Sequence, residues 1–260
     1  MNMEFITGNL LNTTTMATVN NGTSSVDNLF DGNNTSYFTS VGDNNDATTT
    51  TIRIEFSTSK NIDRIALENI NWKGFKIYYN SNTANTFSLD AGSPTSASTW
   101  TGNSTTSLYL CFSTVAASII TFEITTTMDA AEEKEVGEMW IGSLAHRFVD
   151  NPDASGYDPK LDRHEYRHEM SDGGISTFVI QDNFKATVKR KYVDTSEFTD
   201  LKSLYQSNDE FMFIPFPTVT AWDGQIYQVV WTGDFDFYQY TSNHKGNGYS
   251  GKMTLEGVPK

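Results

Sequence analysis

Apolar residues recur in short runs through the first half of the chain, some alternating with polar residues and some continuous. Gly, Asn, Ser and Thr separate these runs, a pattern typical of strands joined by loops rather than of helices. The expected strands are TIRIEF (51–56), IDRIALENI (62–70), GFKIYYN (74–80), SLYLCFS (107–113) and SIITFEITTT (118–127). The pattern predicts a mainly β fold, with a sandwich or jelly roll in this half.

The second half also reads mainly as strands, interrupted by one helix. The expected strands are residues 164–170, 175–181, 184–193, 211–217, 225–233, 236–240 and 250–258. Between them, Asp194 is a plausible N-cap with Glu197 three residues later. The apolar residues that share one helical face are Phe198, Leu201, Leu204 and Tyr205. We therefore expect a C-terminal β domain, an open sheet or split barrel, covered by this helix.

A change in composition near Val149 suggests where the domains meet. Residues 149–160 (VDNPDASGYDPK) contain two prolines, a glycine and several acids. We therefore predict a β-sandwich over 1–148, a linker over 149–160 and a second β domain over 161–260.

The net charge of −14 narrows the choice of partners. Phosphate contacts need a basic surface, so we expect no unaided binding to nucleic acid or to an anionic membrane, and no membrane insertion. The N-terminal residues lack a basic segment followed by an apolar run, so no signal peptide is expected and the chain should fold in the cytoplasm. Cys111 is the only cysteine, which excludes an intramolecular disulfide, and LYLCF predicts that it is buried on a strand.

Residues 164–168 read HEYRH, a literal match to the zinc-hydrolase motif, in which His164 and His168 bind Zn²⁺ and Glu165 activates water. That chemistry needs a helix. The surrounding DRHEYRHEM alternates as a strand does, and SDGG followed by ISTFVIQ is typical of a hairpin turn. In a strand the two histidines lie roughly 13 Å apart. A zinc hydrolase stays as the outlying hypothesis, and we expect no enzyme, because no other catalytic motif is found.

The first half resembles the discoidin or coagulation-factor type C family, also called galactose-binding-like domains, which includes many carbohydrate-binding modules. The segments that carry the resemblance are VDNLFDGNNTSYFTS (26–40), IRIEFSTSKNIDRIALEN (52–69), GFKIYYN (74–80), SIITFEITTT (118–127) and VGEMWIGSL (136–144). The resemblance covers about 140 residues.

The resemblance implies a structural Ca²⁺ in the loop that D-G-N forms. The matching positions are Leu29, Asp31, Asn33, Asn34, Thr35 and Glu138. Such all-oxygen ligation suits a hard cation, and Gly32 allows the tight turn. The alternative is a metal-free turn in which Asp31 and Thr35 make the hydrogen bonds instead.

Sugar sites in this family use loop aromatics, for which Trp72, Tyr79 and Trp100 are the candidates. A lone tryptophan more often caps a core or meets another subunit, because its large apolar body favours interfaces.

The C-terminal stretch resembles minor structural and tail-associated proteins of tailed bacteriophages. The segments are FTDLKSLYQSNDEFMFIPFP, QIYQVVWTGDFDFYQY and GNGYSGKMTLEGV. The resemblance implies a non-enzymatic virion protein of the tail or baseplate, made in the host cytoplasm. Such a protein acts through symmetric contacts with tail proteins and as a homo-oligomer. The alternative is a host-surface carbohydrate-binding, receptor-binding module.

Overall fold

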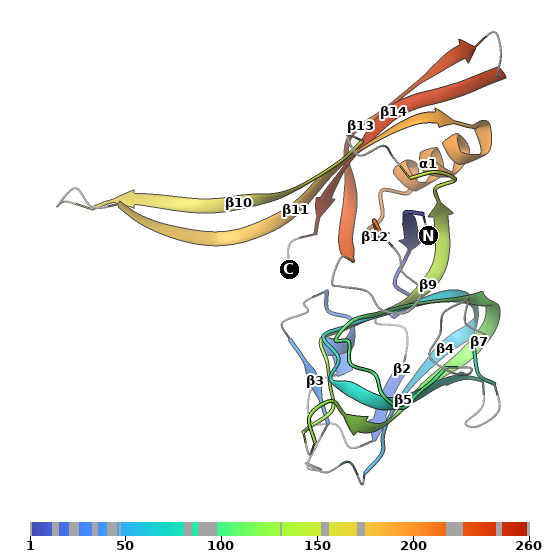
Figure 1. The fold of residues 1–260 in the computed structure, drawn as a ribbon, viewed down its shortest axis with the longest axis vertical. Coiled ribbons are helices and arrows are strands. Elements are labelled where there is room, and N and C mark those ends of the chain that lie inside the picture. Colours follow the sequence, from blue (N-terminus) through green and yellow to red (C-terminus); the bar gives the residue numbers. More distant parts are fainter. Residues whose placement is uncertain are drawn as a thin grey trace.

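Antiparallel strands dominate the computed structural model, with one α-helix in the described part (Figure 1). The structure describes residues 2–11, 16–20, 26–32, 36–40, 46, 48–80, 85–87, 98–130, 132–151, 156–170, 175–216, 226–242 and 246–258. The predicted fold class, a β-sandwich plus a β domain with a covering helix, is confirmed.

The sandwich is built around two very long strands. Its elements are β2 (Met16–Asn20), η1 (Val26–Leu29), β3 (Phe38–Thr39), β4 (Thr50–Glu68), β5 (Trp72–Tyr79), β6 (Thr99–Trp100), β7 (Leu108–Thr127), β8 (Glu135–Val136) and β9 (Glu138–Arg147). Strand β4 joins the two strands predicted at 51–56 and 62–70, and β7 joins those predicted at 107–113 and 118–127. Register shifts between Glu55 and Lys60 and between Ile62 and Arg64 let the pair bend without ending.

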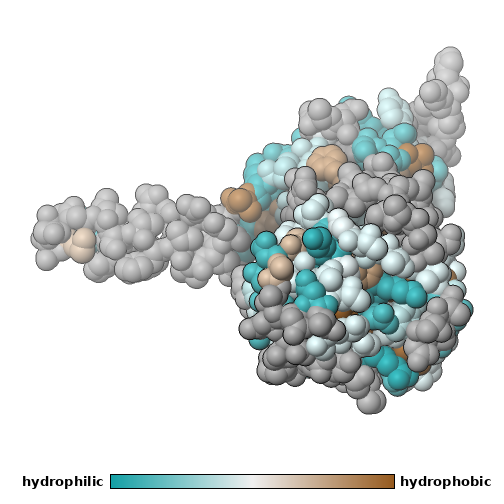
Figure 2. All heavy atoms as spheres, turned by 60° about the horizontal axis from the view of Figure 1, so that its bottom comes forward, coloured by the Kyte–Doolittle hydropathy of each residue, from teal (hydrophilic) through white to brown (hydrophobic). Residues whose placement is uncertain are grey.

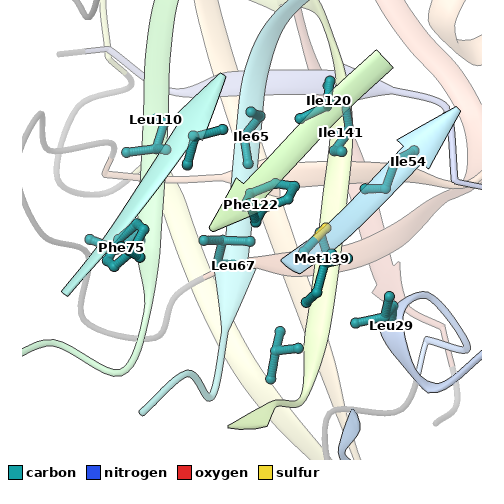
Figure 3. Packing of buried hydrophobic residues seen from close by; sticks show 14 of the residues in the cluster. Leu29, Ile54, Ile65, Leu67, Phe75, Leu110, Ile120, Phe122, Met139 and Ile141 are labelled. Carbon is teal, nitrogen blue, oxygen red and sulfur yellow. The ribbon is translucent and has the colours of Figure 1, made fainter. Parts of the chain in front are cut away.

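Because β4 and β7 bend together, their halves belong to two layers. The first half of β4 pairs with β2 and with the second half of β7, which also pairs with β5. The second half of β4 pairs with β9 and with the first half of β7. Alternate side chains of both halves enter one core, where Figure 3 shows Ile54, Leu67, Leu110 and Phe122.

The second sheet combines both ends of the chain. Its strands are β1 (Glu4–Thr7), β10 (Tyr157–Glu169), β11 (Ile175–Val193), β12 (Phe211–Ile214), β13 (Tyr227–Ser242) and β14 (Gly246–Gly257). The order is β10-β11-β14-β13-β12-β1-β9, and β9 continues into the sandwich. The first residues of the chain therefore share a core with the last hundred: Met3 and Phe5 pack with Phe211 and Phe213. The boundary at 149–160 stays a prediction.

Helix α1 (Thr195–Ser207) covers one face of this sheet, as predicted. The Asp194 carboxylate accepts a hydrogen bond from the Glu197 N–H and caps the helix. Leu201 and Leu204 are buried in the core, with Phe198 and Tyr205 packed against it. Among the described residues, no helix is long and apolar enough to cross a membrane.

The two halves meet at an apolar cluster on the outside of the sandwich. Its residues are Ile6, Ala66, Tyr109, Cys111, Trp140, Met212, Ile214 and Ile226. Cys111 is 4% exposed, as its sequence context predicts.

A buried ion cluster adjoins the apolar one and is centred on Glu4, whose side chain is fully buried. Its carboxylate accepts hydrogen bonds from Arg64 Nε at 3.1 Å, from the Tyr109 hydroxyl at 2.5 Å and from Arg147 Nε. Burial, and then the Glu4 charge, raises the pKa of Tyr109, so the hydroxyl stays a donor. The N-terminal strand is thereby tied to β4, β7 and β9 at once.

We expect Glu4→Gln to lower the free energy of unfolding by about 3 kcal/mol, because it removes the fully buried carboxylate of the cluster and leaves the buried Arg64 guanidinium with Asp63, 3.4 Å away, as its remaining charged partner. Urea denaturation measures the change. Glu55→Gln is the matched control: Glu55 pairs with Arg53 at 2.9 Å on the surface, so it should cost no more than about 1 kcal/mol. A Glu4→Gln variant as stable as the control would contradict this role.

Candidate functional site

The D-G-N loop is held by a residue far along the chain. The backbone N–H of Gly32 donates a 3.0 Å hydrogen bond to Glu138 Oε2 on β9. Gly32 has φ of +75°, which explains why a glycine stands there. Next to it, Asp31 Oδ2 accepts a 2.5 Å hydrogen bond from the Ser36 hydroxyl. Leu29 ends η1 and is buried in the sandwich core.

The loop lies at a cavity of about 260 Å³ between the sandwich and the second sheet. The lining residues are Asn9, Leu11, Phe30, Gly32, Glu138, Trp140, Glu210 and Gln228. Gln228 on β13 lies so close that a Cβ on Gly32 would be 3.2 Å from its Oε1, and its Nε2 donates to Glu210 at 2.6 Å. The loop that marks the sandwich in the sequence is therefore also part of the joint between the halves.

The structure brings together part of the predicted calcium set. Glu138 is buried and faces the loop that contains Asp31, while Asn33, Asn34 and Thr35 lie outside the described residues. No group of three His, Cys, Asp or Glu side chains within the described ranges is arranged to hold a metal. A cation here would need carbonyl or amide oxygens besides the two carboxylates, which is the donor mixture that Ca²⁺ accepts.

The three aromatic residues suggested for sugar stacking belong to the sandwich interior. Trp72 is 0% exposed and Trp100 is 3% exposed, and the Trp100 ring stacks on Phe75 with centroids 4.4 Å apart. Tyr79 is half-buried and its ring meets Phe87 at 5.0 Å. Neither tryptophan has a ring face free for a pyranose. Trp100 is buried because its short strand β6 pairs with β5. The polar residues around Trp100 in the sequence did not indicate this pairing.

A different surface of the sandwich carries accessible polar groups. A groove of about 520 Å³ lies on the outward face of β4, β7 and β5, with lining residues Thr51, Arg53, Tyr78, Asn80, Ile119, Thr121 and Glu123. Strand alternation accounts for it, since Ile52, Ile54 and Phe122 point into the core and leave their neighbours outside. The polar residues that alternate with apolar ones in TIRIEF and IITFEI could have predicted this polar outward face from the sequence.

Tyr78 and Glu123 form the polar centre of the groove. The Tyr78 hydroxyl donates to Glu123 Oε2 at 3.4 Å, and the Lys76 ammonium lies 5.6 Å from the Tyr78 ring centroid. Burial, together with the Glu123 charge, raises the pKa of Tyr78, so the phenol stays protonated. The Asn80 side chain is engaged in the turn, where its Oδ1 accepts from Ser118 and Ile119. Tyr78 is only 3% exposed and holds Glu123 from below, so Arg53 and Glu123 are the charged groups that a polar ligand can reach; Arg53 also pairs with Glu55 at 2.9 Å.

The H-E-x-x-H residues lie in strand β10, as the alternation predicted. His164 is opposite Gln181 and His168 is opposite Ser176 in the antiparallel pairing with β11. The helix that would place both imidazoles on one ion is not formed.

Strands β10 and β11 form an arm that projects from the molecule (Figure 1). Strand β14 pairs with β11 from Lys185 onward, whereas residues 175–184 of β11 pair only with β10. Strand β10 is at the edge of the sheet. The outer part of the arm is therefore a two-stranded ribbon. The alternation of polar and apolar residues predicted this hairpin. It did not predict that the hairpin extends beyond the sheet, because the sequence of β10 and β11 does not show how far β14 pairs alongside them.

Neither a family model nor a curated protein sequence matches the chain. Among solved structures, chitosan-binding module 1 from the chitosanase/glucanase of Paenibacillus sp. IK-5 is similar at 18% identity and a TM-score of 0.40, over 53% of this chain and 100% of that one. The family 32 carbohydrate-binding module of Clostridium perfringens NanJ, in complex with galactose, gives 14% and 0.40, over 54% and 99%. A Ruminococcus gnavus GH29 fucosidase gives 16% and 0.40, over 53% of this chain and 27% of that one. The similar structures are thus mainly carbohydrate-binding modules with a galactose-binding-like fold, matched over about half of the chain.

Proposed function

We propose that this chain is a non-enzymatic structural protein of a bacteriophage tail or baseplate, which assembles with copies of itself through its β10–β11 arm. The observation that carries the proposal is the arm. It extends past the sheet that supports its base, and among the described strands none pairs with the outer edge of β10 or with the outer edge of residues 175–184 of β11.

An isolated two-stranded ribbon is marginally stable in water. Its unpaired N–H and C=O groups also form a template for strands of other chains. Such a ribbon gains stability by lying on, or pairing with, a neighbouring subunit, a common mode of recognition between β proteins. An extended arm is therefore better suited to assembly than to action as a monomer.

The base of the arm adds apolar surface. Leu161 on β10 is 73% exposed, and Phe216, whose ring centroid lies 5.7 Å from that of Tyr157 on β10, is 49% exposed. Figure 2 shows apolar residues where the arm joins the body, beside a sandwich face that is largely polar. Apolar groups gathered at one point of a polar surface favour a protein contact.

The order of elements after residue 194 supports the phage part of the proposal. Helix α1, strand β12 with the FMFI sequence, then β13 and β14 follow one another as in the tail-protein resemblance. An acidic chain without a disulfide also suits a protein assembled inside a cell, and the virion is the proposed location.

Shortening the arm tests the assembly. Replacing residues 163–182 with an Asn-Gly turn joins Asp162 to Asn183, which are opposite each other in the hairpin. We expect the full chain to form an oligomer in multi-angle light scattering and the shortened chain to stay a monomer with a similar thermal midpoint. A full chain that is monomeric at every concentration, or a shortened chain with the same mass as the full one, would contradict the proposal.

We also propose that the D-G-N loop holds a structural Ca²⁺ with Asp31 and Glu138. The support is the position of the buried Glu138 carboxylate against the loop, together with the oxygen donors around the joint. Such an ion would have a structural role and not a catalytic one. It would neutralise Glu138 and fix the loop against β9 and β13.

Thermal unfolding in CaCl₂ and in EDTA tests this site. At a Ca²⁺ concentration a hundred times its dissociation constant, the folded state should gain about 2.7 kcal/mol. Glu138→Gln should abolish the gain, whereas Glu55→Gln on the surface should keep it. Equal midpoints for the unaltered chain in CaCl₂ and EDTA would leave the metal-free turn as the correct interpretation.

The second candidate function is host-glycan binding by the sandwich. The groove on β4, β7 and β5 favours it, because Arg53 and Glu123, the latter oriented by the buried Tyr78 hydroxyl, provide charged hydrogen-bonding groups along its lining. This site differs from the buried tryptophans that the sequence suggested.

A glycan array and adsorption to host cells test the second candidate. If the groove binds sugar, Arg53→Ala should weaken binding at least about tenfold, since a hydrogen bond to a charged group contributes roughly 1.5–3 kcal/mol. Lys73→Ala, at an exposed β5 position outside the groove, should bind as the unaltered chain does. An array with no specific ligand, or equal binding by both variants, would exclude this function for the groove.

A further inference from the structure

Strand β10 is the last strand of the sheet, and among the described strands it pairs with β11 alone. At the base of the arm, the Gly156 carbonyl oxygen accepts a 2.6 Å hydrogen bond from the Lys189 N–H. Because hydrogen-bonded and non-hydrogen-bonded positions alternate along an antiparallel pair, the backbone of Pro159 faces the outer edge. Proline has no N–H to offer a further strand, so this part of the edge is protected. Beyond Pro159 the strand contains no proline, and its edge can pair.

The outer half of β10 has a regular order of charges. In RHEYRHE, every second residue is charged and the sign alternates, through Arg163, Glu165, Arg167 and Glu169. Residues two apart lie on the same side of a strand. The bulge of the hairpin leaves its extra residue, Ile180, on β11, so β10 itself continues without an insertion. Positive and negative residues therefore alternate along one side of an uninterrupted strand.

Strand β11 does not match this order of charges. In the hairpin register, uncharged residues are opposite three of the four charges: Glu165 is opposite Val179, Arg167 is opposite Thr177, and Glu169 is opposite Ile175. Of the four, only Arg163 is opposite a residue of the other sign, Asp182. Residues of opposite charge that are directly opposite each other stabilise a sheet, and like charges destabilise it. The residues opposite β10 in the hairpin thus leave most of its charge order unexplained.

The order is self-complementary when two copies of β10 run antiparallel. With Tyr166 opposite itself, Arg163 is opposite Glu169 of the second copy and Glu165 is opposite its Arg167. The twofold axis repeats both pairs, so all four charges of each copy are opposite the other sign. Moving the axis to Glu165 or to Arg167 puts arginine opposite arginine and glutamate opposite glutamate. Charges on an edge usually oppose pairing, but here they favour one register over its two neighbours.

Pairing along β10 also gives the arm the strands that it lacks. The outer arm is a two-stranded ribbon, because β14 pairs with β11 only from Lys185 onward. Two arms joined along β10 form a sheet in the order β11-β10-β10-β11, and three or more strands are what an independently stable sheet needs. The other open edge, residues 175–184 of β11, contains a single charged residue, Asp182. That edge has no order of charges that could select a register.

We propose that two copies of this chain pair along their β10 edges, antiparallel and centred on Tyr166, to form a twofold dimer. The inference rests on the proposed self-assembly through the arm and specifies the strand and the register of the contact. The contact is isologous, because the same residues of both copies meet, so it closes at the dimer. The match to H-E-x-x-H in residues 164–168 is then the centre of the paired segment.

Changing the charges tests the contact by light scattering across a concentration range. Arg163→Glu with Arg167→Glu makes this side of β10 wholly acidic, and Glu165→Arg with Glu169→Arg makes it wholly basic. Each variant alone should dimerise at least tenfold more weakly than the unaltered chain, because like charges then meet at all four positions. An equimolar mixture of the two variants should recover most of the dimer, because every opposite pair again has both signs.

The control for the acidic variant is Lys73→Glu with Lys202→Glu. Both lysines are exposed and lie outside the arm, on β5 and α1. The control alters the net charge by the same amount as the acidic variant, and it should keep the mass of the unaltered chain.

A cysteine test reports the register. Tyr166→Cys should form a disulfide-linked dimer in oxidised glutathione, because residues directly opposite each other have Cα atoms about 4.5–5.5 Å apart, within the span of a disulfide. Met170→Cys should stay unlinked. Met170 is also exposed, but in this register it lies eight residues, or roughly 27 Å, from Met170 of the second copy. The native Cys111 is 4% exposed, so it does not compete.

The outcomes separate this contact from the proposed function. An unaltered chain that never exceeds monomer mass ends both. If the unaltered chain assembles and the shortened arm prevents it, while the acidic and basic variants each keep full mass, only the contact proposed here is wrong. The same holds if Met170→Cys links as readily as Tyr166→Cys. Failure of the mixed variants to dimerise, when circular dichroism shows both to be folded, also overturns it.

Discussion

The carboxylate of Glu4 fixes how the two halves of this protein are arranged. It is fully buried, and its donors come from β4, β7 and β9, so displacement of strand β1 would take the buried Arg64 and Tyr109 away from the carboxylate that they both contact. An ion pair of this kind is weak evidence for net stability, because desolvation offsets much of its attraction. Its value lies in specificity: few other arrangements of the halves would satisfy all these charged and polar groups.

This joint has consequences for the proposed assembly. The sheet continues through β1 and β9 into the sandwich, so the arm and the long sandwich strands belong to one hydrogen-bonded framework. A linker of ordinary flexibility would let the arm and the sandwich point in many relative directions. A fixed relation between them lowers the entropic cost of forming a closed assembly, since less freedom is lost on association. The D-G-N loop contributes to the same rigidity, because Gly32 lies between Glu138 and Gln228.

Local patterning predicted the strands and the helix well. The alternation in TIRIEF and the helical spacing of Leu201 and Leu204 indicate which face of each element is buried. This information is local, because it lies in residues that are close together in the sequence. The sequence did not predict that the segments 51–56 and 62–70 form the single strand β4. The polar residues 57–61 between them suggest a loop, whereas in the structure a bulge lets the strand continue through them. For the candidate site, the resemblance to the family predicted that Glu138 lies against the D-G-N loop, where it accepts a hydrogen bond from Gly32. It did not predict the burial of Trp100 or the outward groove, because each depends on which strands become neighbours. Such pairings are non-local and leave no signal in a single segment.

The place of β1 also determines the order in which the fold can be completed. Glu4 pairs with Ile214, so β1 finds its second partner only after about 200 further residues have been synthesised. The sandwich strands β4, β7 and β9 can associate earlier, while one edge of β1 stays open. Contacts of such long sequence separation slow folding and expose unpaired edges for longer. Until β12 is in place, that edge of β1 is available to a strand of another copy, which is the step by which exchange of β1 between copies would begin.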